Sequence, residues 1–179
     1  GIRATGIDRV IAEWGVATVT FSRNFPSKND LILAFLAHRH QRWMAWFDEA
    51  LNRHGNTPHA LVPTLVEWFS QPTFRGCAFI NSLSELGASM PDVVSVVQHH
   101  KTDVVARLAK LLPPDHGADV ALTLALTVDG AIVRAQFDST PDAALAGLRC
   151  MLDTWLPSAI TPARTRSAPP PADPVPACP

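Results

Sequence analysis

The side chains with the clearest chemical purpose lie in a short stretch near the start of the chain. Thr18, Thr20 and Ser22 offer hydroxyls there, and Arg23 adds a guanidinium. Presented by one short helix, such groups reach base edges and phosphates in the major groove of DNA. Lys28 follows at the start of the next helical segment, where a cation and the free amides of a helix N-terminus suit a phosphate. These residues predict contact with double-stranded DNA.

Two short helices and the turn between them must position these side chains. The spacing of apolar residues predicts a helix over residues 6–14, which Gly15 and Val16 then break. A second short helix is expected over residues 17–24, and Phe25 and Pro26 end it. Two short helices joined by a tight turn that contains glycine form a helix-turn-helix.

Helical periodicity continues through the rest of the chain, without strand-like alternation of useful length. Ser27 and Asp30 have the spacing of a capping box and predict a long helix that ends near residue 54. Thr57 and Pro58 predict the next start, with a kink or a late beginning at Pro63. Later helices are expected over residues 76–86, 89–112, 118–137 and 141–156, the last one capped by Thr140.

Composition is typical of a globular protein of the cytoplasm. Hydrophobic residues make up 47% of the chain, and the net charge of -1 excludes a uniformly basic nucleic-acid coat. Basic residues outnumber acids over residues 1–54 and the reverse holds over residues 55–160, which suits a protein that touches a polyanion at one end. Three scattered cysteines predict a reducing compartment. No signal-peptide pattern and no apolar run of roughly 20 residues indicates a membrane.

The spacing of the remaining reactive residues does not favour metal binding or catalysis. His38 and His40 lie two residues apart and His99 and His100 are adjacent, so each pair faces different sides of a helix. Cys77 has no base within its helix and suits a small buried thiol, with a redox sensor as the alternative. The chain has no paired Cys-x-x-Cys, no phosphate loop and no nucleophile–base arrangement. We therefore expect no metal, no cofactor and no enzyme.

Residues near the front also follow one known pattern. The matching residues are Thr5, Val10-Ile11-Ala12, Gly15-Val16-Ala17, Phe21-Ser22, Asn24-Phe25, Ser27-Lys28 and Leu31. This series resembles T-x-x-x-I-A-x-x-A-G-V-S-x-x-x-L-Y-x-H-F-x-S-K-x-x-L, the pattern of the TetR (tetracycline-repressor-like) family. The resemblance implies that DNA is bound through Thr5, Ala17, Thr18, Thr20, Ser22, Arg23, Asn24 and Lys28.

The chain departs from the family pattern at two positions and at its front. Ser22 stands where the family has a tyrosine that touches a DNA phosphate, and Asn24 stands where it has a histidine. Only residues 1–4 precede the motif, where the family places a further helix. We therefore expect this chain to bind DNA more weakly than one that carries that helix.

The rear resembles the ligand and dimer domain of one branch of the family, over residues 75–87 and 128–136. The resemblance implies a largely apolar cavity between the helices for a hydrophobic or planar effector. Its expected lining is Trp46, Phe47, Trp68, Phe69, Phe79, Asn81, Val97, His99 and Gln136. Small residues recur over residues 118–137 and 141–156, and the resemblance implies that these two helices form a homodimer interface. Packing within one chain is the alternative.

These inferences predict an all-α protein with three parts. A helix-turn-helix covers residues 1–28, a ligand-binding and dimerisation bundle covers residues 29–158, and a Pro- and Ala-rich tail, expected to be disordered, covers residues 159–179. The expected function is that of a cytoplasmic transcriptional repressor, released from a palindromic operator by a small-molecule effector. The first alternative is a dimeric ligand-binding protein with impaired or lost DNA binding, and the second is a small all-helical enzyme.

Overall fold

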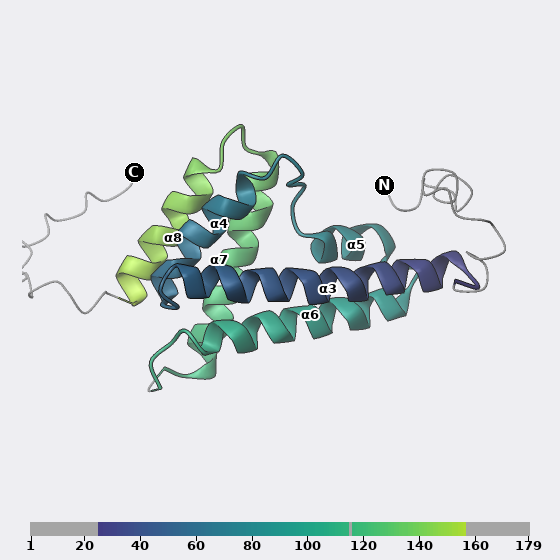
Figure 1. Ribbon diagram of the computed structural model, residues 1–179, viewed down its shortest axis with the longest axis horizontal. Coiled ribbons are helices and arrows are strands. Elements are labelled where there is room, and N and C mark those ends of the chain that lie inside the picture. Colours follow the sequence, from purple (N-terminus) through teal and green to yellow (C-terminus); the bar gives the residue numbers. More distant parts are fainter. Residues whose placement is uncertain (1–24, 115, 157–179) are drawn as a thin grey trace, which may run out of the picture.

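The structure, a computed structural model, describes residues 25–114 and 116–156, and every regular element in these ranges is a helix (Figure 1). The expected all-α fold is thereby confirmed. Residues 1–24 of the predicted helix-turn-helix and the whole predicted tail, residues 159–179, lie outside the described residues. The elements are α3 (Lys28–Arg53), the 3-10 helix η1 (Pro58–Ala60), α4 (Leu61–Phe69), α5 (Ala78–Leu86), α6 (Pro91–Ala109), α7 (Ala118–Phe137) and α8 (Asp142–Trp155).

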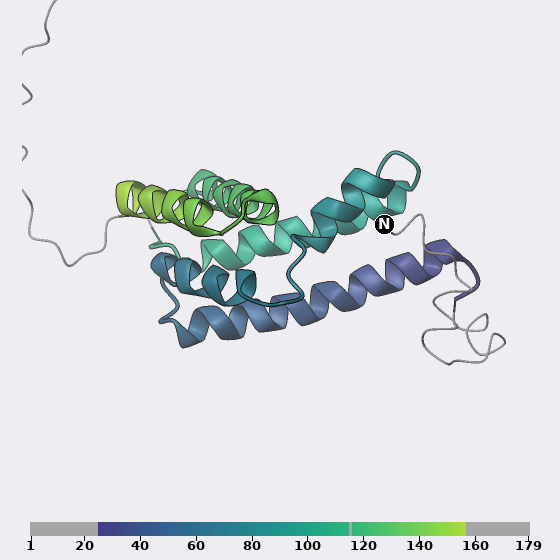
Figure 2. The same ribbon diagram turned by 90° about the horizontal axis from the view of Figure 1, so that it is seen from above.

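The described helices form three layers, which Figure 2 shows from above. The long helix α3 lies on one side, and α4 and α6 pack against it. Helices α7 and α8 lie side by side on the far side of α4 and α6. Helix α5 packs against α3 and α6, toward the end of the molecule at which α3 begins.

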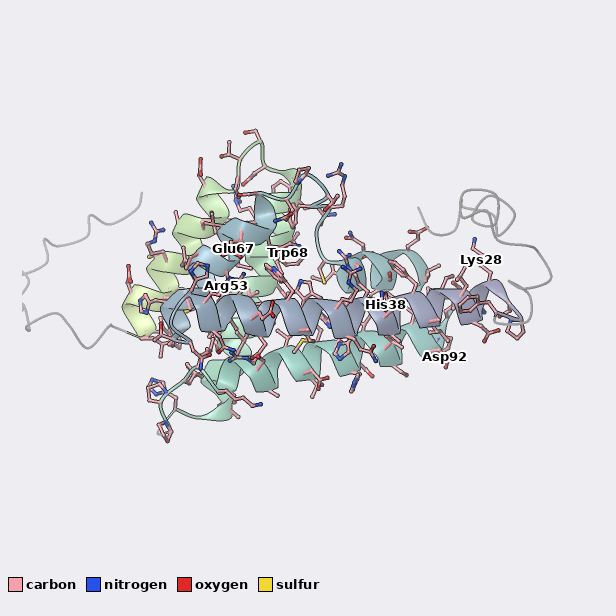
Figure 3. All side chains as sticks on the ribbon, viewed as in Figure 1. Lys28, His38, Arg53, Glu67, Trp68 and Asp92 are labelled. Carbon is pink, nitrogen blue, oxygen red and sulfur yellow. The ribbon has the colours of Figure 1, made fainter. Side chains whose placement is uncertain are left out.

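Helices α3 and α6 run side by side in the same direction. Near the middle of α3, His40 contacts His100 of α6. Further toward the C-terminal ends of both helices, Asp48 of α3 contacts Arg107 of α6. Both helices therefore begin at the same end of the molecule, which Lys28 on α3 and Asp92 on α6 mark in Figure 3.

Local sequence explains where two of these helices begin. The Ser27 hydroxyl accepts a hydrogen bond from the Asp30 amide over 3.1 Å, as the capping-box spacing predicts. Ser27 is thus the N-cap residue, and α3 starts at Lys28. The late start predicted at Pro63 is also found, because the chain first forms η1 and α4 begins only at Leu61. Proline is tolerated there since the first turn of a helix leaves its amides unpaired.

The predicted cap of α8 is wrong. Pro141, not Thr140, is the N-cap residue, and no side chain caps the helix. The Thr140 hydroxyl instead donates to the carboxylate of Asp142 over 2.9 Å. Thr140 therefore stands one residue too early to bond the free amides of the first turn.

The core follows from apolar residues at helical spacing. Its largest fully buried side chains include Leu36, Phe47, Leu51, Leu61, Leu65, Phe79, Leu108, Leu124, Leu148 and Leu152. The buried side of α6 also holds two polar residues, His100 and Arg107, at the spacing of its core positions. Burying such groups costs free energy unless they are hydrogen-bonded, so the hydrogen-bond partners of His100 and Arg107 show how α6 is held against α3.

Among the described helices, α7 alone has the length and composition to cross a membrane, whereas no apolar run of this length is expected from the sequence. One side of this helix packs against α6 and α8. On that side Asp129 forms an ion pair with Lys101 of α6 over 2.5 Å. The other side exposes an apolar stripe made of Leu122, Leu126, Val133 and Phe137. A stripe of this kind is typical of a surface that another protein covers.

Candidate functional site

An open cavity of about 390 Å³ lies between α3, the end of α4 and the loop that joins α4 to α5. Its volume falls in the range of roughly 300–1,000 Å³ that small-molecule sites occupy. The lining consists of Arg39, Arg42, Trp43, Trp46, Trp68, Gln71, Thr73, Phe74, Arg75 and Gly76. A second hollow, beside Cys77 and His100, measures only about 10 Å³, roughly the space of one water molecule.

Three tryptophans form the apolar wall of the larger cavity. Trp43 stacks on Phe47 with ring centroids 4.6 Å apart, and Trp68 meets Trp43 edge-on at 5.4 Å. Trp46 lies 6.2 Å from Trp68, which in turn contacts Phe74 at 5.4 Å. Trp68 belongs to α4, above α3 in Figure 3. Because each ring is held by another ring, the wall is a preformed set of aromatic faces tilted against one another, and a planar molecule can stack on one of them.

Three arginines make the cavity cationic. Arg75 is held in place, since its Nη1 donates to the carbonyl oxygens of Pro72 and Phe74 over 3.0 and 2.6 Å. Within the described part of the chain, neither Arg39 nor Arg42 has a carboxylate partner. A guanidinium binds carboxylates and phosphates through paired hydrogen bonds and also stacks on aromatic rings. The cavity is therefore suited to a ligand with a flat apolar part and a negative charge.

A hydrogen-bonded rim supports the loop side of this cavity. The Gln136 side-chain amide donates to Oδ1 of Asn81 over 3.3 Å, and Nδ2 of Asn81 donates to the Arg75 carbonyl over 2.9 Å. Gly76 has a φ of 79°, and a Cβ there would clash with the Gln136 side chain. Glycine at this position is thus favoured by its left-handed backbone, and the missing Cβ leaves room for the amide end of Gln136.

The structure places the predicted ligand residues in three groups. Trp46 and Trp68 line the cavity, whereas Asn81 and Gln136 build its rim. The predicted residues that lie in the core are Phe47, Phe69, Phe79 and Val97. His99 is exposed on α6 and does not line the cavity. The part that these residues play in effector binding stays a prediction, but the expectation of a largely apolar lining is corrected by the three arginines.

Sequence reasoning missed Arg39, Arg42 and Trp43. Together with Trp46 they follow the spacing i, i+3, i+4 and i+7, which places four side chains on one face of a helix. The sequence shows this spacing directly. It was not recognised because a face that combines arginine with tryptophan is neither an apolar stripe nor a polar face. It indicates a mixed surface that offers both aromatic stacking area and guanidinium donors for an anion.

A histidine pair lies next to the cavity, deeper between α3 and α6. His100 is 2% exposed and stacks on Phe79 with centroids 3.6 Å apart. Burial, and after it the nearby Lys101 cation, lowers the pKa of His100 from 6.5 to about 3, so this imidazole is neutral at physiological pH. Its Nδ1 lies 3.0 Å from Nδ1 of His40. One of these two nitrogens must carry the proton and the other must accept it.

Of the predicted DNA-binding residues, only Lys28 lies in the described part of the chain, as the first residue of α3. The others lie outside the described residues, namely Thr5, Ala17, Thr18, Thr20, Ser22, Arg23 and Asn24. Their role in binding DNA stays a prediction.

Solved structures of other proteins share this arrangement of helices. SCO4454, a TetR-family transcriptional regulator from Streptomyces coelicolor, is 28% identical to the chain, and the match covers 86% of each chain with a TM-score of 0.74. The chain therefore has the fold of the TetR-family regulators. The reduced form of E. coli NemR has the same fold at 20% identity, with 84% of this chain and 87% of NemR covered and a TM-score of 0.71. Neither the family models nor the curated proteins give a match.

In this chain, α7 and α8 share an exposed face of apolar and small residues. Gly130 lies in the middle of the apolar stripe of α7, and Gly147 lies on the exposed side of α8. No side chain comes within 4 Å of the place that a Cβ on either glycine would take. Trp155, at the end of α8, is 58% exposed. This face of the TetR-family fold can therefore accept a close-packed second surface.

Proposed function

We propose that this chain is a ligand-responsive, DNA-binding regulator of transcription. It acts in the cytoplasm as a homodimer and represses from a palindromic operator until a small molecule releases it. The cationic, tryptophan-walled cavity of about 390 Å³ is the observation that carries this proposal. The description of SCO4454 as a transcriptional regulator supports it.

The proposed effector is a planar molecule that bears a carboxylate or another anionic group. The tryptophan wall offers stacking surface, and the two arginines on α3 have no carboxylate partner among the described residues. Because a charge-assisted hydrogen bond contributes about 1.5–3 kcal/mol, these arginines favour an anion over its neutral analogue.

Helix α3 offers a direct route from the cavity to the DNA-binding end. Arg39, Arg42, Trp43 and Trp46 all lie on this helix. Its first residue, Lys28, is also the last residue of the predicted helix-turn-helix. A ligand that favours a shifted position of α3 also shifts the helix-turn-helix that precedes it. The ligand releases DNA because it binds this shifted conformation more tightly than the DNA-binding conformation.

The proposed dimer joins the α7 and α8 faces of two chains. Such a four-helix contact would cover the exposed apolar stripe, and obligate interfaces bury on the order of 2,000 Å² or more. Two recognition helices then lie about 34–36 Å apart, one turn of DNA, on a palindromic site.

A gel-shift assay on the DNA upstream of the chain's own coding sequence tests the proposal. A retarded band that disappears on addition of a planar acid is the expected result. Ligand binding by a chain that retards no DNA would instead identify a dimeric ligand-binding protein, because the cavity and the α7–α8 face lie wholly within residues 28–156.

A further inference from the structure

Two histidines and an aspartate meet on the surface where α3 and α6 run side by side. Nε2 of His40 lies 3.3 Å from Oδ2 of Asp103, and Nε2 of His99 lies 3.4 Å from the same oxygen. One ligand atom from each of the three residues falls within 4.8 Å of the other two. None of the three lines the effector cavity, so this cluster is a separate feature.

The spacing of these atoms matches that of ligands around one transition-metal ion. Zn²⁺ holds imidazole nitrogens and carboxylate oxygens at about 2.0–2.2 Å in a tetrahedron, so neighbouring ligand atoms lie about 3.3–3.6 Å apart. Both short distances to the Asp103 oxygen fall in this range. We propose that His40, His99 and Asp103 form a binding site for a divalent transition-metal ion that links α3 to α6.

The donor set favours transition metals over magnesium or calcium. Two imidazoles and one carboxylate suit Zn²⁺, Co²⁺, Ni²⁺ or Cu²⁺, whereas Mg²⁺ and Ca²⁺ prefer oxygen ligands throughout. The His99 side chain is 69% exposed, and that of Asp103 is 39% exposed. The remaining coordination positions therefore face solvent and can hold water.

A buried neighbour orients one of the three ligands. Metal-bound histidines donate their second ring N–H to a fixed acceptor, which sets both tautomer and ring direction. With the metal on Nε2 of His40, the proton is on Nδ1, which lies 3.0 Å from Nδ1 of His100. His100 is 2% exposed and is held by stacking on Phe79. His100 is thus a fixed hydrogen-bond acceptor for the Nδ1–H of His40.

The place of His40 in α3 gives an independent reason to look for a ligand. Leu36, His40 and Phe47 recur on the core-facing side of this helix, and the side chain of His40 is only 17% exposed. An apolar residue would fill this position at lower cost, because a buried imidazole needs hydrogen-bonding partners. A metal link between two parallel helices gives this polar residue a function.

Titration of the purified, chelator-stripped chain with Zn²⁺ tests the site. Competition with a chromophoric chelator should show one tight site per chain, and Co²⁺ should give the visible absorption of a four- or five-coordinate ion. His99→Ala and Asp103→Asn should each weaken Zn²⁺ binding at least tenfold, since even the loss of an outer-shell partner costs ~10–100-fold. Both side chains are exposed enough for the variants to fold, which circular dichroism checks.

His38→Ala is the matched control. This residue is exposed on α3, two positions before His40, and is not part of the cluster. Its loss should leave Zn²⁺ affinity within twofold of that of the parent chain. The proposal is overturned if the parent chain binds no Zn²⁺, if either cluster variant loses less than tenfold, or if His38→Ala loses as much as they do.

Discussion

Arg107 on α6 donates from Nε to the carboxylate of Asp48 on α3 over 2.5 Å, although its own side chain is only 8% exposed. A second guanidinium nitrogen donates to Oδ1 of Asn56 over 2.7 Å, in the turn that follows α3. Asn56 has a φ of 51°, the left-handed backbone that asparagine tolerates. This buried cation therefore fixes the far ends of α3 and α6 relative to each other.

Loss of the Asp48 carboxylate should destabilise the fold. Asp48→Ala leaves a buried guanidinium with one partner fewer, so we expect a loss of about 1.5–3 kcal/mol in the free energy of unfolding. Urea denaturation measures it. Glu49→Ala is the control, since that carboxylate is 80% exposed and lies 3.9 Å from Arg53, and an exposed pair contributes about 0–1 kcal/mol. Equal losses in the two variants would show that the Arg107 contact is not a structural link.

The outline of the fold could be read from the sequence, whereas contacts between helices could not. Ser27 and Pro63 predict helix starts because their effects on the backbone are local and depend only on neighbouring residues in the sequence. His40 and Asp103 lie 63 residues apart, and only the packing of α3 on α6 brings them together. The arginines of the cavity were not predicted for another reason. A hydrophobic pattern distinguishes buried apolar positions from exposed polar ones, whereas the lining of this cavity combines arginines with tryptophans.

Glu67 should make the stability of the chain depend on acid pH. Hydrogen bonds from His54, at 2.6 Å, and from Arg53, at 2.8 Å, lower the pKa of this carboxyl below its ordinary value of 4.5; Figure 3 labels Arg53 and Glu67 where α3 and α4 meet. A carboxyl whose pKa is lower in the folded state stabilises the fold above its unfolded pKa. This contribution is lost as pH falls from about 4.5 through the folded value.

Glu67→Gln tests this pH dependence. The unfolding free energy of the parent chain should fall more steeply below pH 5 than that of the variant, with the largest difference between them at neutral pH. The effect is small, because the Glu67 side chain is 36% exposed. Parallel curves from pH 7 to pH 3 would contradict the assignment.

Gly130→Arg should break the proposed dimer without unfolding the chain. Apart from the backbone of α7 itself, the added Cβ meets nothing within 4 Å in one chain, and removing glycine from a helix interior raises helix propensity. A bulky cation in the centre of the apolar stripe is incompatible with close helix packing. Sedimentation equilibrium should show a dimer for the parent chain and a monomer for the variant. Ala106→Arg, exposed on α6, is the control, and a variant that remains dimeric places the interface elsewhere.

Arg42→Gln should weaken the binding of planar acids about tenfold or more, because one charge-assisted hydrogen bond contributes about 1.5–3 kcal/mol. Quenching of the cavity tryptophans reports the binding. The methyl ester of the same acid should bind weakly to both proteins, since it carries no charge for the arginine to recognise. Lys110→Gln, an exposed change outside the cavity, should bind the acid like the parent chain. Acid and ester of equal affinity would exclude the proposed anion site.

Fluorescence anisotropy of labelled upstream DNA, with and without a planar acid that binds the cavity, tests whether this chain is a ligand-responsive regulator. The dimer should bind this DNA with an affinity that falls as salt rises, by ~0.9 log units per phosphate contact per log unit of salt. Saturating ligand should weaken binding at least tenfold in the parent chain and much less in Arg42→Gln. DNA affinity that is the same with and without saturating ligand would contradict a ligand-responsive regulator.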